Sequence, residues 1–150
     1  MVEIKIEGLA ELDFALTELP KSTAKATLRR VLKKAARPTQ EAWKAKVRPR
    51  RDTGHYEESI ITGTKLTRRQ ARFAKQETKS SSEIHIGTSD PAGVQDEFGN
   101  FRAPAHPSAR PAWEETQDEA LAIIRENLGD EIEKSRQRLA AKAARIAAKG

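Results

Sequence analysis

The side chains that could carry chemistry in this chain are few and lie far apart in the sequence. The three histidines are His55, His85 and His106, and the chain contains no cysteine. The histidines lie thirty and twenty-one residues apart, with no pair one helical turn apart and no facing carboxylate motif, so no metal spacing is visible. We therefore expect the histidines to be surface or hydrogen-bonding residues, and we expect the chain to bind no metal and no cofactor.

One cluster of residues could in principle form an acid/base site. Asp52, His55, Glu57 and Glu58 stand close together in the sequence, and such groups can transfer protons when they are held side by side. The same residues also fit the start of a helix, with Asp52 as the N-cap and the two glutamates complementing the helix dipole. We favour this structural interpretation and predict that the protein is not an enzyme.

The charged residues are segregated along the chain, and their layout matters more than the net charge of +6. Residues 21–51 hold twelve Lys and Arg against the single acid Glu41, whereas residues 111–133 hold eight acids against Arg125. Residues 134–150 hold six bases and no acid. Such segregation favours the docking of unlike surfaces, either within one fold or between copies. Four bases of the first segment are candidate contacts: Arg29, Arg30, Lys33 and Lys34.

The composition indicates one domain with a lean core. Of the 150 residues, 37% are hydrophobic and 33% are charged, against roughly 45–50% and 25% in typical globular domains. A core this lean favours stabilisation by neighbouring copies. The chain has no apolar run approaching the ~18 residues of a membrane span, and it begins without the pattern of a signal peptide. We therefore expect a soluble, intracellular protein.

The first third of the chain is predicted to be mainly helical. Residues 2–6 alternate between apolar and charged side chains, the pattern of a half-buried strand. Leucines over residues 9–19 predict a short amphipathic helix that ends at a proline. From about Ser22 an apolar stripe predicts a long helix whose other faces carry the bases. Pro38 lies inside that stripe and predicts a kink or a restart of the helix.

The middle of the chain is predicted to hold a small sheet. Residues 59–66 and 83–87 have strand composition, and residues 67–82 between them are basic with almost no apolar side chains. This intervening segment predicts a long hairpin loop or an exposed basic arm.

The last third is predicted to be helical around a proline-rich loop. A short helix follows Pro91, the loop spans residues 100–111, and a C-terminal helix of up to about 35 residues starts near Trp113. We expect a domain over residues 1–135 and a helical extension rich in Ala, Lys and Arg over residues 136–150. The elements together predict an α+β fold, with a small, mainly antiparallel sheet packed against the long basic helix and the long C-terminal helix.

Two stretches of this sequence resemble motifs of the bacteriophage tail-completion, or tail-component, family. The first is PRRDTGHYEESI over residues 49–60, and the second is DEFGN over residues 96–100, followed by Pro104-Ala-His-Pro107 and Arg110-Pro111-Ala112. The flanking elements also occur in the family's order. Tyr56 stands where leucine is common in the family, and Ser108-Ala109 replace a bulky pair.

The motif residues also have physical roles of their own. Thr53 and Gly54 suit a turn, and Ser59 offers a hydroxyl where the chain enters a strand; this turn could stabilise the fold or contact a partner. In the second motif, Phe98 is expected to anchor the core, with Gly99 at positive φ.

The same motif is expected to define the loop of residues 100–109. Glu97 and Arg110 could close it by pairing, and prolines stiffen it for docking on a neighbour, although a purely internal role stays open. The stiffening prolines are Pro104, Pro107 and Pro111.

The resemblance implies a structural subunit of the phage neck. It implies a homo-oligomeric ring, with hexameric symmetry expected from the tail, between the head-side connector and the tail terminator, through which DNA passes without sequence-specific binding. The protein would lie in the virion after assembly in the host cytoplasm. The alternative is a basic nucleic-acid-binding protein, which the pI near 9.7 favours.

Overall fold

The computed structural model describes residues 9–50, 52–74, 76 and 81–150. The predicted strand at residues 2–6 lies outside the described residues. Within them, the elements are α1 (Leu9–Thr17), α2 (Lys21–Val47), the 3₁₀ turn η1 (Arg48–Arg50), α3 (His55–Ser59), β1 (Ile61–Gly63), α4 (Arg68–Ala71), β2 (His85–Gly87), α5 (Ala92–Phe98) and α6 (Ala109–Lys149).

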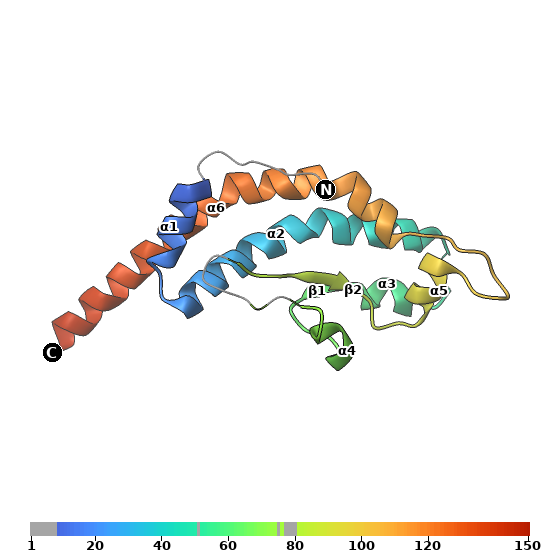
Figure 1. Cartoon of the computed structure of the whole chain (residues 1–150), viewed down its shortest axis with the longest axis horizontal. Helices are drawn as coiled ribbons and strands as arrows, with labels where there is room; N and C mark the ends of the chain where they lie inside the picture. The colour runs from blue at the N-terminus through green and yellow to red at the C-terminus, as the bar shows by residue number, and fades with distance from the viewer. Residues whose placement is uncertain (1–8, 51, 75, 77–80) are drawn as a thin grey trace.

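The molecule is built in layers around α2, as Figure 1 shows. α6 runs along one side of α2, and the two-stranded sheet lies on its other side, with α4 beyond the sheet. α1 packs on α2 and α6 near the N-terminal end of α2. The α+β architecture is confirmed, but its layering differs from the predicted one: the sheet lies against α2, whereas α6 lies on the opposite side of that helix.

The apolar stripe of α2 forms its buried face. Val31, Ala35, Ala36 and Trp43 are buried as the spacing predicts. The helix continues through Pro38 without a break, which excludes a restart at that position. A proline removes one helical donor, and the packing of α2 on α6 along its length supports the remaining turns.

α2 and α6 are antiparallel and meet through small and hydroxyl-bearing side chains. Thr27 Oγ1 lies 2.7 Å from Ser135 Oγ, and Thr39 Oγ1 lies 2.7 Å from Thr116 Oγ1, each pair in a buried position. The apolar core forms two clusters along this pair of helices. One contains Leu16, Leu19, Ala24, Val31, Leu128 and Ile132, and the other contains Trp43, Val47, Ile60 and Ala112.

Part of the basic face of α2 is paired with α6 of the same chain. Glu131, whose side chain is 8% exposed, lies 3.1 Å from Arg30 Nε and 3.3 Å from Lys34 Nζ. Lys46 Nζ lies 2.6 Å from Glu115 Oε1. The sequence left open whether the basic and acidic segments meet within one fold or between copies, and these residues meet within the fold.

The sheet is shorter than the strand composition predicts. β1 and β2 pair antiparallel with Thr62 opposite Ile86. The basic segment between them contains the single-turn helix α4, which the side chains of Thr67 and Gln70 cap reciprocally. The segment is thus partly structured where it is described, and its described bases are exposed.

α6 spans 41 residues and is longer than predicted. From residue 140 onward every side chain is exposed, and this end of α6 projects past the other elements in Figure 1. Ala-rich helices without packing partners are marginal in water, so its stability depends on continuity with the packed part of α6.

The buried carboxylate of Glu131 gives the fold a pH dependence. The hydrogen bond from Arg30, followed by that from Lys34, lowers the pKa of Glu131 below its ordinary value of 4.5. The stabilisation from the charged form is therefore fully present above about pH 5 and is lost as the pH falls through the lowered pKa. We expect Glu131→Gln to lower the free energy of unfolding by about 1–3 kcal/mol at pH 7.

The measurement is urea unfolding of wild type, Glu131→Gln and the exposed control Glu133→Gln between pH 7 and pH 3. The difference between wild type and Glu131→Gln should shrink below pH 4.5, whereas the control should stay close to wild type at pH 7. A difference that is independent of pH would contradict the role given to the charged carboxylate.

Candidate functional site

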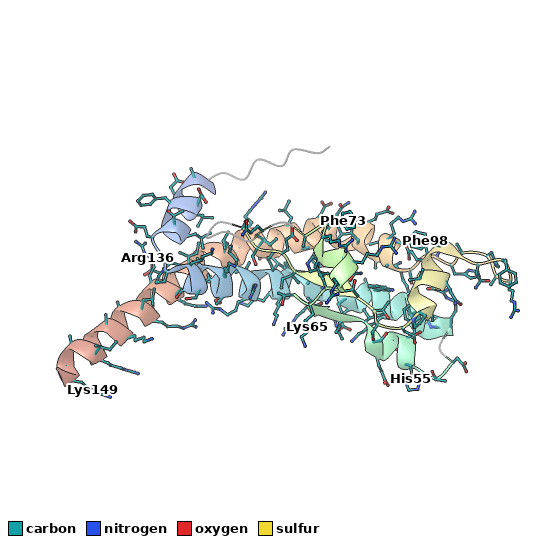
Figure 2. All side chains as sticks on the ribbon, turned by 60° about the horizontal axis from the view of Figure 1, so that its bottom comes forward. His55, Lys65, Phe73, Phe98, Arg136 and Lys149 are labelled. Carbon is teal, nitrogen blue, oxygen red and sulfur yellow. The ribbon has the colours of Figure 1, made fainter. Side chains whose placement is uncertain are left out.

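The two motif stretches come together at one end of the molecule. α3 follows the first motif's Thr53-Gly54 turn, α5 ends at Phe98, and both lie near the C-terminal end of α2 (Figure 1). In Figure 2, His55 and Phe98 lie at this end, far from Arg136 and Lys149 at the other. We call the network that joins the two motifs the motif junction; it consists of Trp43, Arg50, Tyr56, Asp96, Glu97 and Ser108.

Asp96 is the hub of the motif junction. Its Oδ2 accepts a hydrogen bond from Ser108 Oγ at 2.8 Å and a longer one from Tyr56 Oη at 3.5 Å. Arg50 forms an ion pair with the same carboxylate and also donates to the carbonyl of His106 at 3.3 Å. The Asp96 carbonyl accepts from the backbone N–H of His106 at 2.8 Å. Asp96 therefore ties the loop to both motifs.

A buried polar contact ties the junction to α2. Trp43 Nε1 lies 3.2 Å from both Tyr56 Oη and Ser108 Oγ, and the two hydroxyl oxygens are 3.3 Å apart. Ser108 is completely buried. Tyr56 and Ser108 are two of the positions that depart from the family pattern, and here they face each other. Each polar group in this buried site has a partner, as buried polar groups require.

Glu97 caps the N-terminus of α6. Its carboxylate accepts the backbone N–H groups of Ser108, Ala109 and Arg110 at 2.9, 3.0 and 3.2 Å. The Arg110 side chain adds an ion pair at 3.5 Å, which confirms the predicted pair. A negative charge at this position satisfies N–H groups that have no helical partner and complements the helix dipole. Glu97 thus fixes where α6 begins as well as closing the loop.

Gly99 turns the chain out of α5 into the loop. Its φ is +72°, as predicted, and a Cβ at this position would lie 2.7 Å from the backbone nitrogen of Ala105. Asn100 then forms a tight turn, because its side-chain Oδ1 accepts from the N–H groups of Arg102 and Ala103 at 2.8 and 2.9 Å. Backbone hydrogen bonds and side-chain caps therefore hold the loop in one shape.

The aromatic side chains around the loop point outward. Phe98 is 71% exposed, Phe101 is 92% exposed and Trp113 is 50% exposed. The expectation that Phe98 anchors the core is wrong. The anchor at this end of α2 is Trp43, which lies in the second core cluster. Pro104 and Pro107 are exposed on the loop, and Pro111 lies in the first turn of α6.

The Thr53-Gly54 turn leads into α3. Gly54 has φ +89° and occupies the N-cap position, so Asp52 is not the N-cap as expected. Thr53 Oγ1 accepts from the N–H of His55 at 3.4 Å. Ser59 Oγ donates to the carbonyl of Tyr56 at 2.8 Å and contacts the Thr88 hydroxyl. These contacts are internal to the fold and hold α3 against the segment before α5.

Glu57 of the first motif pairs with Arg48, which follows the end of α2. Arg48 donates to Glu57 Oε1 from Nε at 2.9 Å and from Nη2 at 2.7 Å. This hydrogen bond and the charge of Glu57 raise the pKa of Arg48 above its ordinary value. Glu57 is in the first turn of α3, as predicted, and its partner is this arginine.

The four bases singled out on α2 do not form one surface. Arg30 and Lys34 face α6, whereas Lys33 is exposed and lines a hollow together with residues of β1 and β2. In the part of the chain that the structure describes, no group of three or more His, Asp or Glu side chains is placed to hold a metal ion. No helix among the described residues is long and apolar enough to cross a bilayer.

Sequence reasoning named Glu97 and Gly99 but missed the partners that complete the junction. Trp43, Arg50 and Ser108 come from three separate elements, and only the antiparallel packing of α2 and α6 brings them together. A buried tryptophan near the end of a helix and a serine before a helix are weak signals when each is taken alone.

Comparison with known proteins identifies a family. The sequence model of the family described as "Bacteriophage HK97-gp10, putative tail-component" matches residues 10–99. This range includes the first motif, α2 and α5, and ends at Gly99. No curated protein and no solved structure matches the chain.

The geometry at Gly99 predicts that this glycine cannot be replaced without loss of stability. We expect Gly99→Ala to lower the free energy of unfolding by about 1–3 kcal/mol, because alanine at positive φ is strained and its Cβ meets the backbone of Ala105. Gly129→Ala is the matched control. Its added Cβ would have Leu12 Cδ2 at 3.9 Å, and alanine should stabilise the interior of α6 by about 0.5–1 kcal/mol. Thermal unfolding of both variants measures the two effects, and equal changes in stability would contradict this prediction.

Proposed function

The chain belongs to the HK97-gp10-like family of bacteriophage tail components, and from that premise we propose that it is a structural subunit of the phage neck. Copies form a ring between the head-side connector and the tail terminator. The ring has six-fold symmetry, which is the symmetry expected of the tail. The ring leaves a channel through which the genome passes. The family is structural and not an enzyme family, and the work of the subunit is mechanical.

The observation that carries this proposal is a pair of exposed phenylalanines, which we call the aromatic tip, on a loop that is held in one shape by hydrogen bonds. Phe98 and Phe101 are presented to solvent, while Asp96 and Glu97 fix the loop beneath them. Exposed aromatic side chains on a preorganised loop are typical of protein interfaces, since little entropy is lost when they dock. Arg102 stacks over Phe101 at 4.9 Å, which adds a further preferred interface residue to the tip.

The lean core supports the same proposal. Beyond the loop, Phe14 and Ile146 are also exposed, so the described part of the chain leaves apolar surface uncovered at several places. Assembly with copies of itself and with neighbouring neck and tail proteins would cover such surface. The proposed location is the virion, after assembly in the host cytoplasm.

The alternative of a basic nucleic-acid-binding protein depended on the bases of residues 21–51. Arg30, Lys34 and Lys46 of that segment lie against carboxylates of α6, where they are less available to phosphates. Contact with DNA inside the channel would then be electrostatic and independent of sequence.

The proposal predicts that the aromatic tip is needed for joining and not for folding. The free energy of unfolding of the double variant Phe98→Ser, Phe101→Ser should lie within about 0.5 kcal/mol of the wild-type value, because substitutions of exposed residues have small effects. Heads and tails assembled with this variant should fail to join in an in-vitro complementation assay. This variant tests docking better than a Gly/Ser replacement of residues 101–108, because that replacement would also remove the buried Ser108.

The matched control is Phe14→Ser, which removes an exposed phenylalanine from α1, away from the loop. It should keep joining at the wild-type level. Full joining by the tip variant would rule out docking through the loop, and a large fall in its melting temperature would assign the loop an internal role.

A further inference from the structure

Two exposed surfaces of opposite charge remain after the internal ion pairs of the fold are formed. The basic surface consists of Lys65, Arg68, Arg69 and Arg72, on and beside α4, all of which are exposed. The acidic surface consists of exposed residues of α6, namely Glu114, Asp118, Glu119, Glu126, Asp130 and Glu133. Among the described residues, no ion pair involves any member of either surface. Arg125 is the one base within the acidic stretch.

The two surfaces lie on opposite sides of the molecule. In Figure 1, α6 lies on one side of α2, and α4 lies beyond the sheet on the other side. Figure 2 agrees, because turning the lower side forward brings α4, with Lys65 and Phe73, in front of α2 and α6. The basic surface therefore cannot reach the acidic surface of the same chain.

We propose that a second copy of this chain docks head to tail, with its basic surface on the acidic surface of the first. This inference rests on the proposed function, and it names the surfaces through which neighbouring copies in the ring meet. Like charges would face each other in a symmetric pairing of either surface with itself, which is unfavourable. A head-to-tail contact uses each surface once per copy and closes into a ring when the rotation between copies allows it.

An exposed aromatic side chain accompanies the basic surface, because Phe73, which directly follows Arg72, is 85% exposed. An interface of this kind combines an aromatic anchor with complementary charge, the first supplying affinity and the second orientation. A second copy is favoured over DNA as the occupant because DNA would match only the basic surface. The acidic surface would repel phosphates.

The test is a pair of charge-reversed variants. One carries Arg68→Glu, Arg69→Glu and Arg72→Glu, and the other carries Glu114→Lys, Asp118→Lys and Glu119→Lys. Sedimentation velocity over a concentration series gives the dissociation constant of self-association at low salt, near 50 mM, and at about 500 mM, where exposed charges are screened.

Each variant alone should self-associate at least about tenfold more weakly than wild type at low salt, because both of its surfaces then carry the same sign. An equal mixture of the two should recover association, since the basic surface of one variant meets the acidic surface of the other. The chain with all six changes should also recover it. A control with Lys142→Glu, Arg145→Glu and Lys149→Glu reverses three exposed bases of the C-terminal extension and should associate as wild type does.

Several results would overturn the inference. They are wild-type protein that stays monomeric at every concentration, single variants that associate as wild type does, or a mixture that recovers nothing. Loss of DNA binding without loss of self-association in the α4 variant would assign the basic surface to nucleic acid. In each of these cases, the neck role is tested separately by the assay in which phage heads are joined to phage tails. If heads and tails join in the complete absence of the protein, the neck role is refuted.

Discussion

The close antiparallel contact between α2 and α6 is the constraint on which the rest of the structure depends. Small side chains and two hydroxyl pairs, Thr27 with Ser135 and Thr39 with Thr116, line this contact. Buried hydroxyl groups lose their bonds to water, so each pair stabilises only the register in which the two oxygens meet. Glu131, held by Arg30 and Lys34, strengthens the same register. The contact therefore specifies alignment as well as stability.

That alignment determines where the motif junction forms. Because the helices are antiparallel, the start of α6 lies beside the end of α2, and Ser108 comes within 3.2 Å of Trp43 Nε1. The Asp96 and Glu97 carboxylates then hold the loop between α5 and α6 from beneath. A shift of the helices by one turn, about 5.4 Å, would separate these groups. The loop geometry is thus a consequence of helix packing far from the loop itself.

The sequence predicted most of the local structure and little of the long-range pairing. The period of apolar residues located α1, α2 and α6, and the Glu-Phe-Gly motif located the positive-φ turn at Gly99. These features depend on neighbours within a few residues. The ion pair of Lys46 with Glu115 and the contact of Trp43 with Ser108 join residues more than sixty positions apart, and no local pattern encodes them.

The wrong prediction for Phe98 also comes from a long-range contact that no local pattern encodes. A large apolar residue beside a glycine is often a core anchor, yet α5 has only seven residues, and so short a helix can bury only a small part of its surface. Glu97 is the residue of this pair that faces the fold, where its charge is needed at the start of α6, and the adjacent Phe98 consequently points away. The hydrogen bonds between the Glu97 carboxylate and the N–H groups at the start of α6 therefore fix the orientation of α5.

The same division of roles extends over the whole chain. Small side chains, hydroxyl pairs and paired charges fill part of the contact between α2 and α6, beside the aliphatic clusters, and Trp43 is the one aromatic side chain among the buried core residues described. The aromatic residues that the core does not use, together with the bases of α4 and the acids of α6, lie on the outside. A lean core and an exposed surface rich in aromatic and charged residues are therefore two results of one packing arrangement, and they suit a subunit whose proposed stability in the virion depends on its neighbours.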